Sequence, residues 1–209
     1  MTYDYIRQPD KIYDESFRLI SEAVDLSGYS AVEAKVAERL VHTNGRVDVV
    51  DVLHISEVAV NAGVQALLKG APILCDARMV TEGIIQRVLP NNNQVTCFLD
   101  QVAFEKDAQD TRSAKAVALW REQIEGSIIA IGNAPTALFR LLENLNDGWP
   151  KPALIVGMPV GFVGAAQSKQ ALIDDFPDVS SIALRGREGG SAYAAAAVNA
   201  LSVLAKQHG

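Results

Sequence analysis

Short apolar segments rich in valine, isoleucine and leucine recur along the chain, separated by longer amphipathic or alanine-rich segments. The short segments do not alternate apolar and polar residues, which is typical of strands covered on both faces of a parallel sheet. We predict strands over 52–56, 72–76, 95–99, 127–132, 153–158 and 181–185, with helices over 57–68, 108–123, 135–145, 164–173 and 190–206. Such repetition predicts a three-layer α/β sandwich with a central, mainly parallel sheet of five or six strands.

Two further helices precede the first predicted strand. The first begins at Pro9, a residue that suits the opening turn of a helix. The second has Ser30 at its start and Glu33 three residues later, the pattern of a capping box, and it ends at Gly45. The sequence contains no linker, low-complexity tract or internal repeat. We therefore expect a single α/β domain over residues 1–209.

The net charge of −6 argues against a nucleic-acid partner, because there is no stripe of lysine and arginine to neutralise phosphates. No apolar run approaches the roughly 18 residues that a transmembrane helix needs. The only cysteines, Cys75 and Cys97, are too far apart for a zinc or redox motif. We expect a cytoplasmic protein that binds neither a membrane nor a metal.

Three glycine-rich turns, 132–136, 157–164 and 186–191, follow predicted strands. The carboxyl ends of parallel strands carry the ligand sites of open α/β sheets, and the N–H groups of a helix start bind anions there. None of the turns has the spacing of a dinucleotide-binding loop or a P-loop. Tight packing of strand against helix explains the glycines equally well.

Of the three histidines in the chain, His42 is the strongest candidate for a catalytic role. It lies in the last turn of the second helix, three residues after Arg39, so both side chains project from one face. An imidazole there could exchange a proton near neutral pH. Pattern alone favours a simpler role, in which the imidazole caps the last carbonyl groups of the helix. We expect His54 to be a core histidine and His208 to do nothing specific.

Two other ionisable residues are candidate ligand contacts. Asp76 ends a predicted strand and could bind a ligand, although an aspartate there more often caps the next helix. Arg112 opens a predicted helix and would suit an anionic group, with a solvated salt bridge as the alternative. The residues give no nucleophile motif and no metal-ligand spacing.

Six sequence blocks together resemble one enzyme family. They are GNAPTALFRLLE (132–143), GMPVGFVGAAQSKQAL (157–172), GREGGSAYAAAAVNAL (186–201), RLVHT (39–43), LCDARMVTEG (74–83) and the short TRS at 111–113. Taken in chain order, over nearly the whole chain, they resemble the precorrin-8X methylmutases of cobalamin biosynthesis. Blocks of this length are far more specific than any single glycine turn.

The resemblance implies an isomerase that moves a methyl group from C11 to C12 of precorrin-8X, or of its cobalt-containing form. It implies a homodimer with a cleft near the subunit interface and no metal, nucleotide or redox cofactor. The family's catalytic histidine matches His42, and its substrate-contacting serine and arginine match Ser16 and Arg39. Matches to ligand-facing motif positions also fall on Thr81, Gly83 and Arg112.

Three positions depart from the family pattern: His54, Gln167 and Glu188. A glutamate in the last glycine turn is unexpected near a substrate with several carboxylates, so either that turn faces away or binding there is weaker. Two alternatives stay open beside the methylmutase. One is a non-catalytic tetrapyrrole carrier between pathway enzymes, and the other is a phosphate- or nucleotide-binding α/β enzyme that uses the three glycine turns.

Overall fold

The structure is a computed structural model that describes residues 1–105 and 109–208. Its strands are β1 (Leu53–Ile55), β2 (Ile73–Cys75), β3 (Val95–Cys97), β4 (Ile128–Ile131), β5 (Leu154–Gly157) and β6 (Ser181–Leu184). Its α-helices are α1 (Pro9–Ala23), α2 (Ala31–Asn44), α3 (Ala59–Leu68), α4 (Arg78–Gly83), α5 (Arg112–Val117), α6 (Pro135–Asn146), α7 (Ala165–Asp175) and α8 (Ser191–His208). Short 3-10 turns are η1 (Val47–Val52), η2 (Gln86–Val88), η3 (Leu99–Gln101) and η4 (Ala118–Trp120).

All six predicted strands form one sheet, with the order β1-β6-β5-β4-β2-β3. Every pairing is parallel except that of β1 with β6. The mainly parallel α/β sandwich predicted from the sequence is therefore confirmed. The two edge strands, β1 and β3, are only half-buried, whereas the four inner strands are buried along their whole length.

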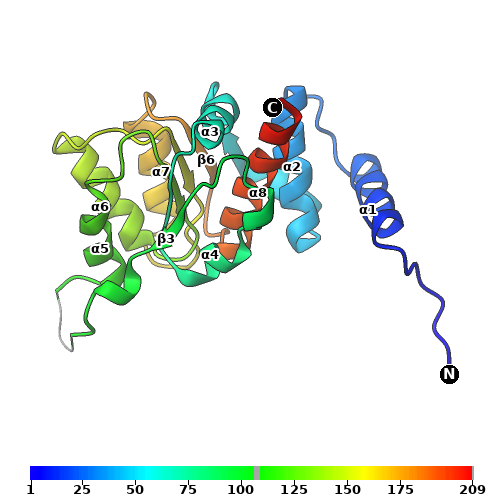
Figure 1. Cartoon of the computed structure of the whole chain (residues 1–209), viewed down its shortest axis with the longest axis horizontal. Coiled ribbons are helices and arrows are strands. Elements are labelled where there is room, and N and C mark those ends of the chain that lie inside the picture. Colours follow the sequence, from blue (N-terminus) through cyan, green and yellow to red (C-terminus); the bar gives the residue numbers. More distant parts are fainter. Residues whose placement is uncertain (106–108, 209) are drawn as a thin grey trace.

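Alternate residues of the inner strands enter two separate hydrophobic clusters. Ile128 and Ala130 of β4 face one cluster, and Ile129 and Ile131 face the other. The first cluster lies under α3, α4 and α8, with α2 packed outside α8, and the second lies under α5, α6 and α7. The sheet is thus covered on both faces (Figure 1), which explains why the strand segments carry no polar alternation.

The predicted helices differ from the structure in two places. Helix α5 begins at Arg112 and continues into η4, which ends at Trp120. The helix predicted over 108–123 therefore includes described residues at both ends that are not helical. Residue 108 itself lies outside the described residues. Helix α4 was missed, because its six residues carry no recognisable start signal and Ala77 gives no side-chain cap.

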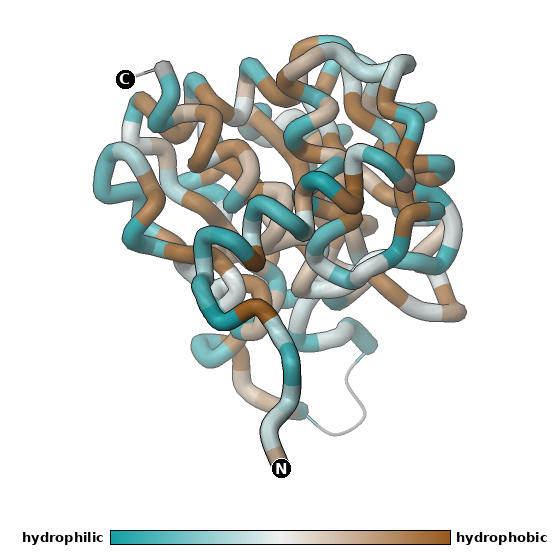
Figure 2. Tube along the Cα trace, turned by 90° about the vertical axis from the view of Figure 1, so that its right-hand side faces the viewer, coloured by the Kyte–Doolittle hydropathy of each residue, from teal (hydrophilic) through white to brown (hydrophobic). Residues whose placement is uncertain are grey.

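The N-terminal helices are placed very differently from one another. Helix α2 has the predicted capping box between Ser30 and Glu33 and ends at Gly45 in the left-handed conformation. Helix α1 has no buried residue, and it lies beyond α2, away from the sheet (Figure 1). Seen from that side, hydrophobic and hydrophilic residues alternate along α1, and the preceding segment extends away from the body (Figure 2).

Candidate active site

The end of α2 lies at the carboxyl edge of the sheet. The chain leaves α2 at Gly45, passes through η1 and enters β1, which runs antiparallel to β6. The backbone N–H of Arg185, just after β6, donates to the carbonyl of Val52 just before β1 (2.7 Å). His42 therefore belongs to the edge where open α/β sheets carry their ligand sites.

An open cavity of about 380 Å³ lies between α1, the end of α2 and η1. His42 and Ser16 both line it, so the structure brings together two of the predicted site residues that are far apart in the sequence. The remaining lining is apolar and includes no lysine or arginine. It consists of Leu19, Ile20, Ala23, Val41, Gly45 and Val47.

The imidazole of His42 packs on the ring of Phe17, with the ring centroids 5.2 Å apart and the planes 22° from parallel. This partial burial lowers the pKa of His42 from its usual value of 6.5, and the positive charge of Arg39 lowers it further. The helix-end effect that would favour the imidazolium does not prevail. His42 can therefore give up a proton more readily than an ordinary histidine.

Arg39 lies one turn before His42 on the same face of α2, as the spacing predicted. Its Nη2 donates a hydrogen bond to the hydroxyl of Tyr13 (2.9 Å). The guanidinium carbon lies 5.5 Å from the ring centroids of both Tyr13 and Phe17. Two aromatic rings of α1 thus hold Arg39 beside His42, a positioning role for α1 that the sequence pattern did not reveal.

Thr81 and Gly83 do not line the His42 cavity, and the structure places them on α4 against α8. The carbonyl of Gly83 accepts a hydrogen bond from the side chain of Asn199 (2.9 Å). A Cβ atom at Gly83 would lie 2.7 Å from the Cβ of Ala195. The close approach of α4 to α8 therefore requires a glycine here, independently of any ligand.

Arg112 also lies outside the His42 cavity. Its Nη2 donates to the carbonyl of Leu99 (2.7 Å) and its Nε donates to the carbonyl of Val102 (3.2 Å). The guanidinium is therefore hydrogen-bonded to the segment that follows β3. The salt bridge that the sequence offered as an alternative is not formed with any of the described carboxylates.

The first glycine turn already binds an anionic side chain of the protein. The buried carboxylate of Asp76, at the end of β2, accepts hydrogen bonds from the backbone N–H groups of Gly132, Asn133 and Ala134 (2.9, 3.0 and 2.7 Å). Burial nevertheless raises the pKa of Asp76, against the opposing effect of these hydrogen bonds. Asp76 thus holds the turn that leads into α6 and does not cap the next helix, and the N–H groups of the turn are used within the protein.

The second and third glycine turns pack directly on each other. The N–H of Gly190 donates to the carbonyl of Met158 (2.8 Å), and a Cβ at Gly189 would lie 2.4 Å from the same oxygen. Lys169 is fully buried beneath them and donates to the carbonyl of Glu188. Burial lowers the pKa of Lys169 to about 8. Packing therefore explains Gly189, and sequence reasoning missed Lys169 as the cation that holds this turn.

The Glu188 carboxylate is paired with Arg46, which is also paired with Asp48. This ion pair connects the third glycine turn to the segment just after α2, four residues from His42. It also balances the charge that made a glutamate unexpected near a polycarboxylate. The third turn and the His42 cavity therefore belong to one continuous edge of the molecule.

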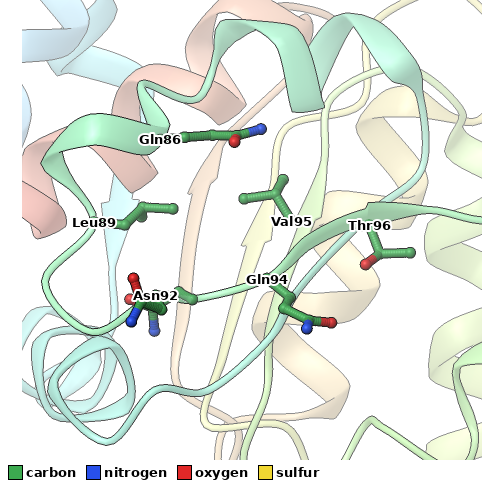
Figure 3. Close-up of a pocket in the computed structure, with 7 residues that line it drawn as sticks. Gln86, Leu89, Asn92, Gln94, Val95 and Thr96 are labelled. Atoms are coloured by element: carbon green, nitrogen blue, oxygen red, sulfur yellow. The ribbon is translucent and has the colours of Figure 1, made fainter.

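A second depression, of about 430 Å³, lies beside the edge strand β3 (Figure 3). Figure 3 shows Gln86 and Leu89 on one side of it and Val95 on the other. Asn93 uses its side-chain amide to bind the carbonyls of Leu67 and Ala71 (both 2.9 Å). The depression is lined by Gln86, Leu89, Asn92, Asn93, Gln94, Val95 and Thr96. None of these side chains is titratable, so the depression is not a candidate for acid–base chemistry.

His54 lies on the edge strand β1 and is half-buried, so the expected core position is only partly right. Its Nδ1 is 3.5 Å from Nη2 of Arg185. Burial lowers its pKa, and Arg185 lowers it further.

In the part of the chain that the structure describes, no three histidine, cysteine, aspartate or glutamate side chains gather as metal ligands. No helix among these residues is long and apolar enough to cross a membrane.

Comparison with known proteins gives consistent matches over nearly the whole chain. The chain is 54% identical to the precorrin-8X methylmutase of Pseudomonas aeruginosa, over 95% of this chain and 97% of that protein. It is 50% identical to that of a Sinorhizobium species, over 96% and 97%. The cobalt-precorrin-8 methylmutase of Salmonella typhimurium is 38% identical, over 94% and 96%.

The fold and the family agree with these sequence matches. A crystal structure of precorrin-8X methylmutase from Thermus thermophilus superposes with a TM-score of 0.84 at 38% identity, covering 95% of this chain and 98% of that one. The model of the precorrin-8X methylmutase family matches residues 11–204. The chain therefore belongs to the precorrin-8X methylmutase family.

Proposed function

We propose that this protein is an isomerase that moves a methyl group from C11 to C12 of precorrin-8X and so forms hydrogenobyrinic acid in corrin-ring biosynthesis. Membership of the family supports this reaction. The observation that carries the assignment to a site is the meeting of Ser16 and His42 in one cavity at the carboxyl edge of the sheet, with Arg39 one helical turn away.

The proposed role of His42 is to donate a proton to the macrocycle and to take it back. Protonation makes the carbon that receives the methyl group more electron-poor, and return of the proton after the shift leaves an isomer with no net change in atoms. The lowered pKa of His42 suits this role, because an acidic imidazolium transfers its proton readily. Such general acid catalysis contributes roughly 10²–10⁴-fold to a rate.

The proposed substrate contacts are Ser16, Arg39, Thr81, Gly83 and Arg112. Ser16 can hydrogen-bond the ligand within the His42 cavity. Arg39, which lines a neighbouring small cavity between α1, α2 and α8, can pair with a carboxylate. The other three lie at the same edge of the sheet, on the helices that follow β2 and β3. Their contacts within the chain hold them in place at that edge, where they can contact the ligand.

We propose the metal-free form as the natural substrate. The relatives from Pseudomonas and Sinorhizobium, at 54% and 50% identity, are named for precorrin-8X, whereas the Salmonella relative named for the cobalt form is 38% identical. A direct comparison of kcat/KM for precorrin-8X and cobalt-precorrin-8 tests this choice. A higher kcat/KM for the cobalt form would contradict it.

We further propose a cytoplasmic homodimer whose protomer is one α/β domain over residues 1–209. The observation that supports a dimer is α1, an amphipathic helix without a buried residue that carries exposed apolar side chains such as Ile12 and Leu19. A second copy of the chain that covers α1 would bury this surface beside Ser16 and His42. A biosynthetic enzyme with a soluble substrate fits the cytoplasm.

The experiment that tests the function is the His42→Ala substitution. We expect the variant to bind hydrogenobyrinic acid as the wild type does and to convert precorrin-8X about 10²–10⁴-fold more slowly, because the proton donor is lost. The measurement is the change in the absorbance spectrum of precorrin-8X with time. His54→Ala is the matched control and should keep the wild-type rate, whereas conversion at wild-type rate by His42→Ala would contradict the proposed role.

The tetrapyrrole-carrier alternative makes a different prediction in the same assay. A non-catalytic carrier binds precorrin-8X and releases it unchanged, whereas an enzyme forms product over many turnovers per subunit. The half-exposed imidazole in the cavity favours the enzyme, because simple binding needs no group that exchanges protons near neutral pH. Binding of precorrin-8X without any formation of product would decide for the carrier.

A further inference from the structure

The His42 cavity can hold only part of a tetrapyrrole. Its volume of about 380 Å³ lies near the lower end of the roughly 300–1,000 Å³ that suits drug-sized ligands, and a macrocycle with several carboxylate side chains is larger. Its lining includes no lysine or arginine for those carboxylates. Other groups at the same edge must therefore contact the rest of the ring.

The second glycine turn carries two strongly exposed apolar side chains at its tip. Phe162 is 83% exposed and Val163 is 89% exposed. They lie between Gly161 and Gly164, whose φ values of 138° and 79° make the turn. Single exposed apolar residues are common, but two adjacent ones at the ligand-binding edge of an α/β sheet indicate a contact surface.

This tip has a fixed base. The N–H of Gly161 donates to the carbonyl of Arg187 (3.2 Å), and Gly189 lies against the carbonyls of Met158 and Pro159 with no room for a Cβ. The neighbouring Glu188 is paired with Arg46, just beyond the His42 cavity. The tip is thus held on the same edge as the cavity by contacts that run through the third glycine turn.

The tip also carries a positive charge. The guanidinium carbon of Arg187 lies 5.2 Å from the ring centroid of Phe162. Arg187 is exposed, and none of the described carboxylates forms a salt bridge with it. Because Glu188 is occupied by Arg46, the field at the tip is dominated by Arg187. The surface therefore combines an apolar face with an available cation.

We propose that the tip formed by Phe162, Val163 and Arg187 is a second substrate contact, in which the two apolar side chains pack on the ring and Arg187 binds a peripheral carboxylate. An apolar ring with an anionic rim complements this combination. A second copy of the chain is a poorer occupant, because a stable interface needs about 800 Å² per partner and this tip offers a few side chains. The proposal rests on the proposed function.

The test is the affinity of the full-length protein for hydrogenobyrinic acid, followed by the absorbance of the ligand. We expect Phe162→Ala to weaken binding about tenfold, as expected for the loss of one buried aromatic contact. Arg187→Gln should weaken it several-fold and reduce its salt dependence. In turnover, both variants should raise KM more than they lower kcat. Phe162→Leu, which keeps an apolar side chain, should retain most of the affinity.

The matched control is the Arg121–Trp149 pair, a second arginine near an aromatic ring (5.7 Å) after α5 and α6, at the opposite edge. Arg121→Gln removes the same charge and should leave binding unchanged. Wild-type affinity in both Phe162→Ala and Arg187→Gln would overturn the contact, as would a Phe162→Ala variant whose change lies in oligomeric state alone. A wild-type protein that fails to bind the ligand would contradict the proposed function itself.

Discussion

The proton affinity of His42 is set by two neighbours that the fold brings to it. Phe17 of α1 covers one face of the imidazole, and Arg39 places a like charge one turn away. Both lower the pKa of His42 from its usual value, so the imidazolium is the major form only at lower pH than for an ordinary histidine. A general acid with this property gives its proton readily but is fully charged only in acidic solution.

The first prediction concerns the pH dependence of kcat/KM. If His42 donates a proton, kcat/KM should fall as the pH rises through the lowered pKa of His42. Arg39→Gln removes the like charge, so the pKa of His42 should rise and the falling limb should move to higher pH. Arg140→Gln, on the distant helix α6, should leave the limb in place. A limb that does not move in Arg39→Gln would contradict the assignment, whatever the change in maximal rate.

The glycine turns and the helices after them show how the elements are joined at the carboxyl edge. Asp76, at the end of β2, binds the N–H groups of the turn between β4 and α6 and so connects two strand ends. The third turn packs on the second through Gly189 and is held from beneath by Lys169. The glycine turns therefore form a rigid base, and the exposed tip at Phe162 and Arg187 is the part of the described turns that is available to a ligand, beside the His42 cavity.

The second prediction concerns this packing. In Gly189→Ala the new Cβ would meet the carbonyls of Met158 and Pro159, which are backbone atoms that cannot move aside cheaply. We expect the free energy of unfolding to fall by about 1–3 kcal/mol, measured by urea denaturation. Gly28→Ala is the control, since nothing lies within 4 Å of its Cβ position. Equal stability of the two variants would contradict the packing role.

Sequence reasoning succeeded for elements whose signals are local. Valine- and isoleucine-rich segments located all six strands, and Ser30, Glu33 and Gly45 located both ends of α2. It failed for α4, whose position depends on contacts with α8 rather than on its own sequence. The pattern alone singled out His42 beside Arg39, and Arg112. Ser16, Thr81 and Gly83 came from resemblance to a family, because the contact of Ser16 with the His42 cavity leaves no periodic signal.

At the scale of the whole molecule, the notable feature is helix α1, which has no buried residue in a single chain. Its Phe17 and Tyr13 pack on His42 and Arg39 of α2, while Ile12 and Leu19 stay exposed. An amphipathic helix that holds site residues in place needs its own support. In the proposed homodimer the second copy provides this support, so assembly and activity are coupled.

The third prediction concerns this assembly. We expect sedimentation velocity to give twice the chain mass of 22.4 kDa. Ile12→Glu should raise the dimer dissociation constant about tenfold or more, because it would bury a charge in the interface. Val58→Glu is the control: Val58 is also exposed but lies at the start of α3, at the opposite edge of the sheet. A wild-type monomer at micromolar concentration would contradict the dimer.

The sequence by itself determined the α/β class, the six strands, the capped helix α2 and, through long matching blocks, the family. These properties follow from local periodicity, from capping chemistry and from motifs that are contiguous in the chain. Only the tertiary structure decided that Asp76 occupies the N–H groups of the first glycine turn, that Arg112 binds backbone carbonyls and that the pKa of His42 is lowered. Each of these depends on which distant residue comes within a few ångströms, and that is decided by how the helices pack on the sheet.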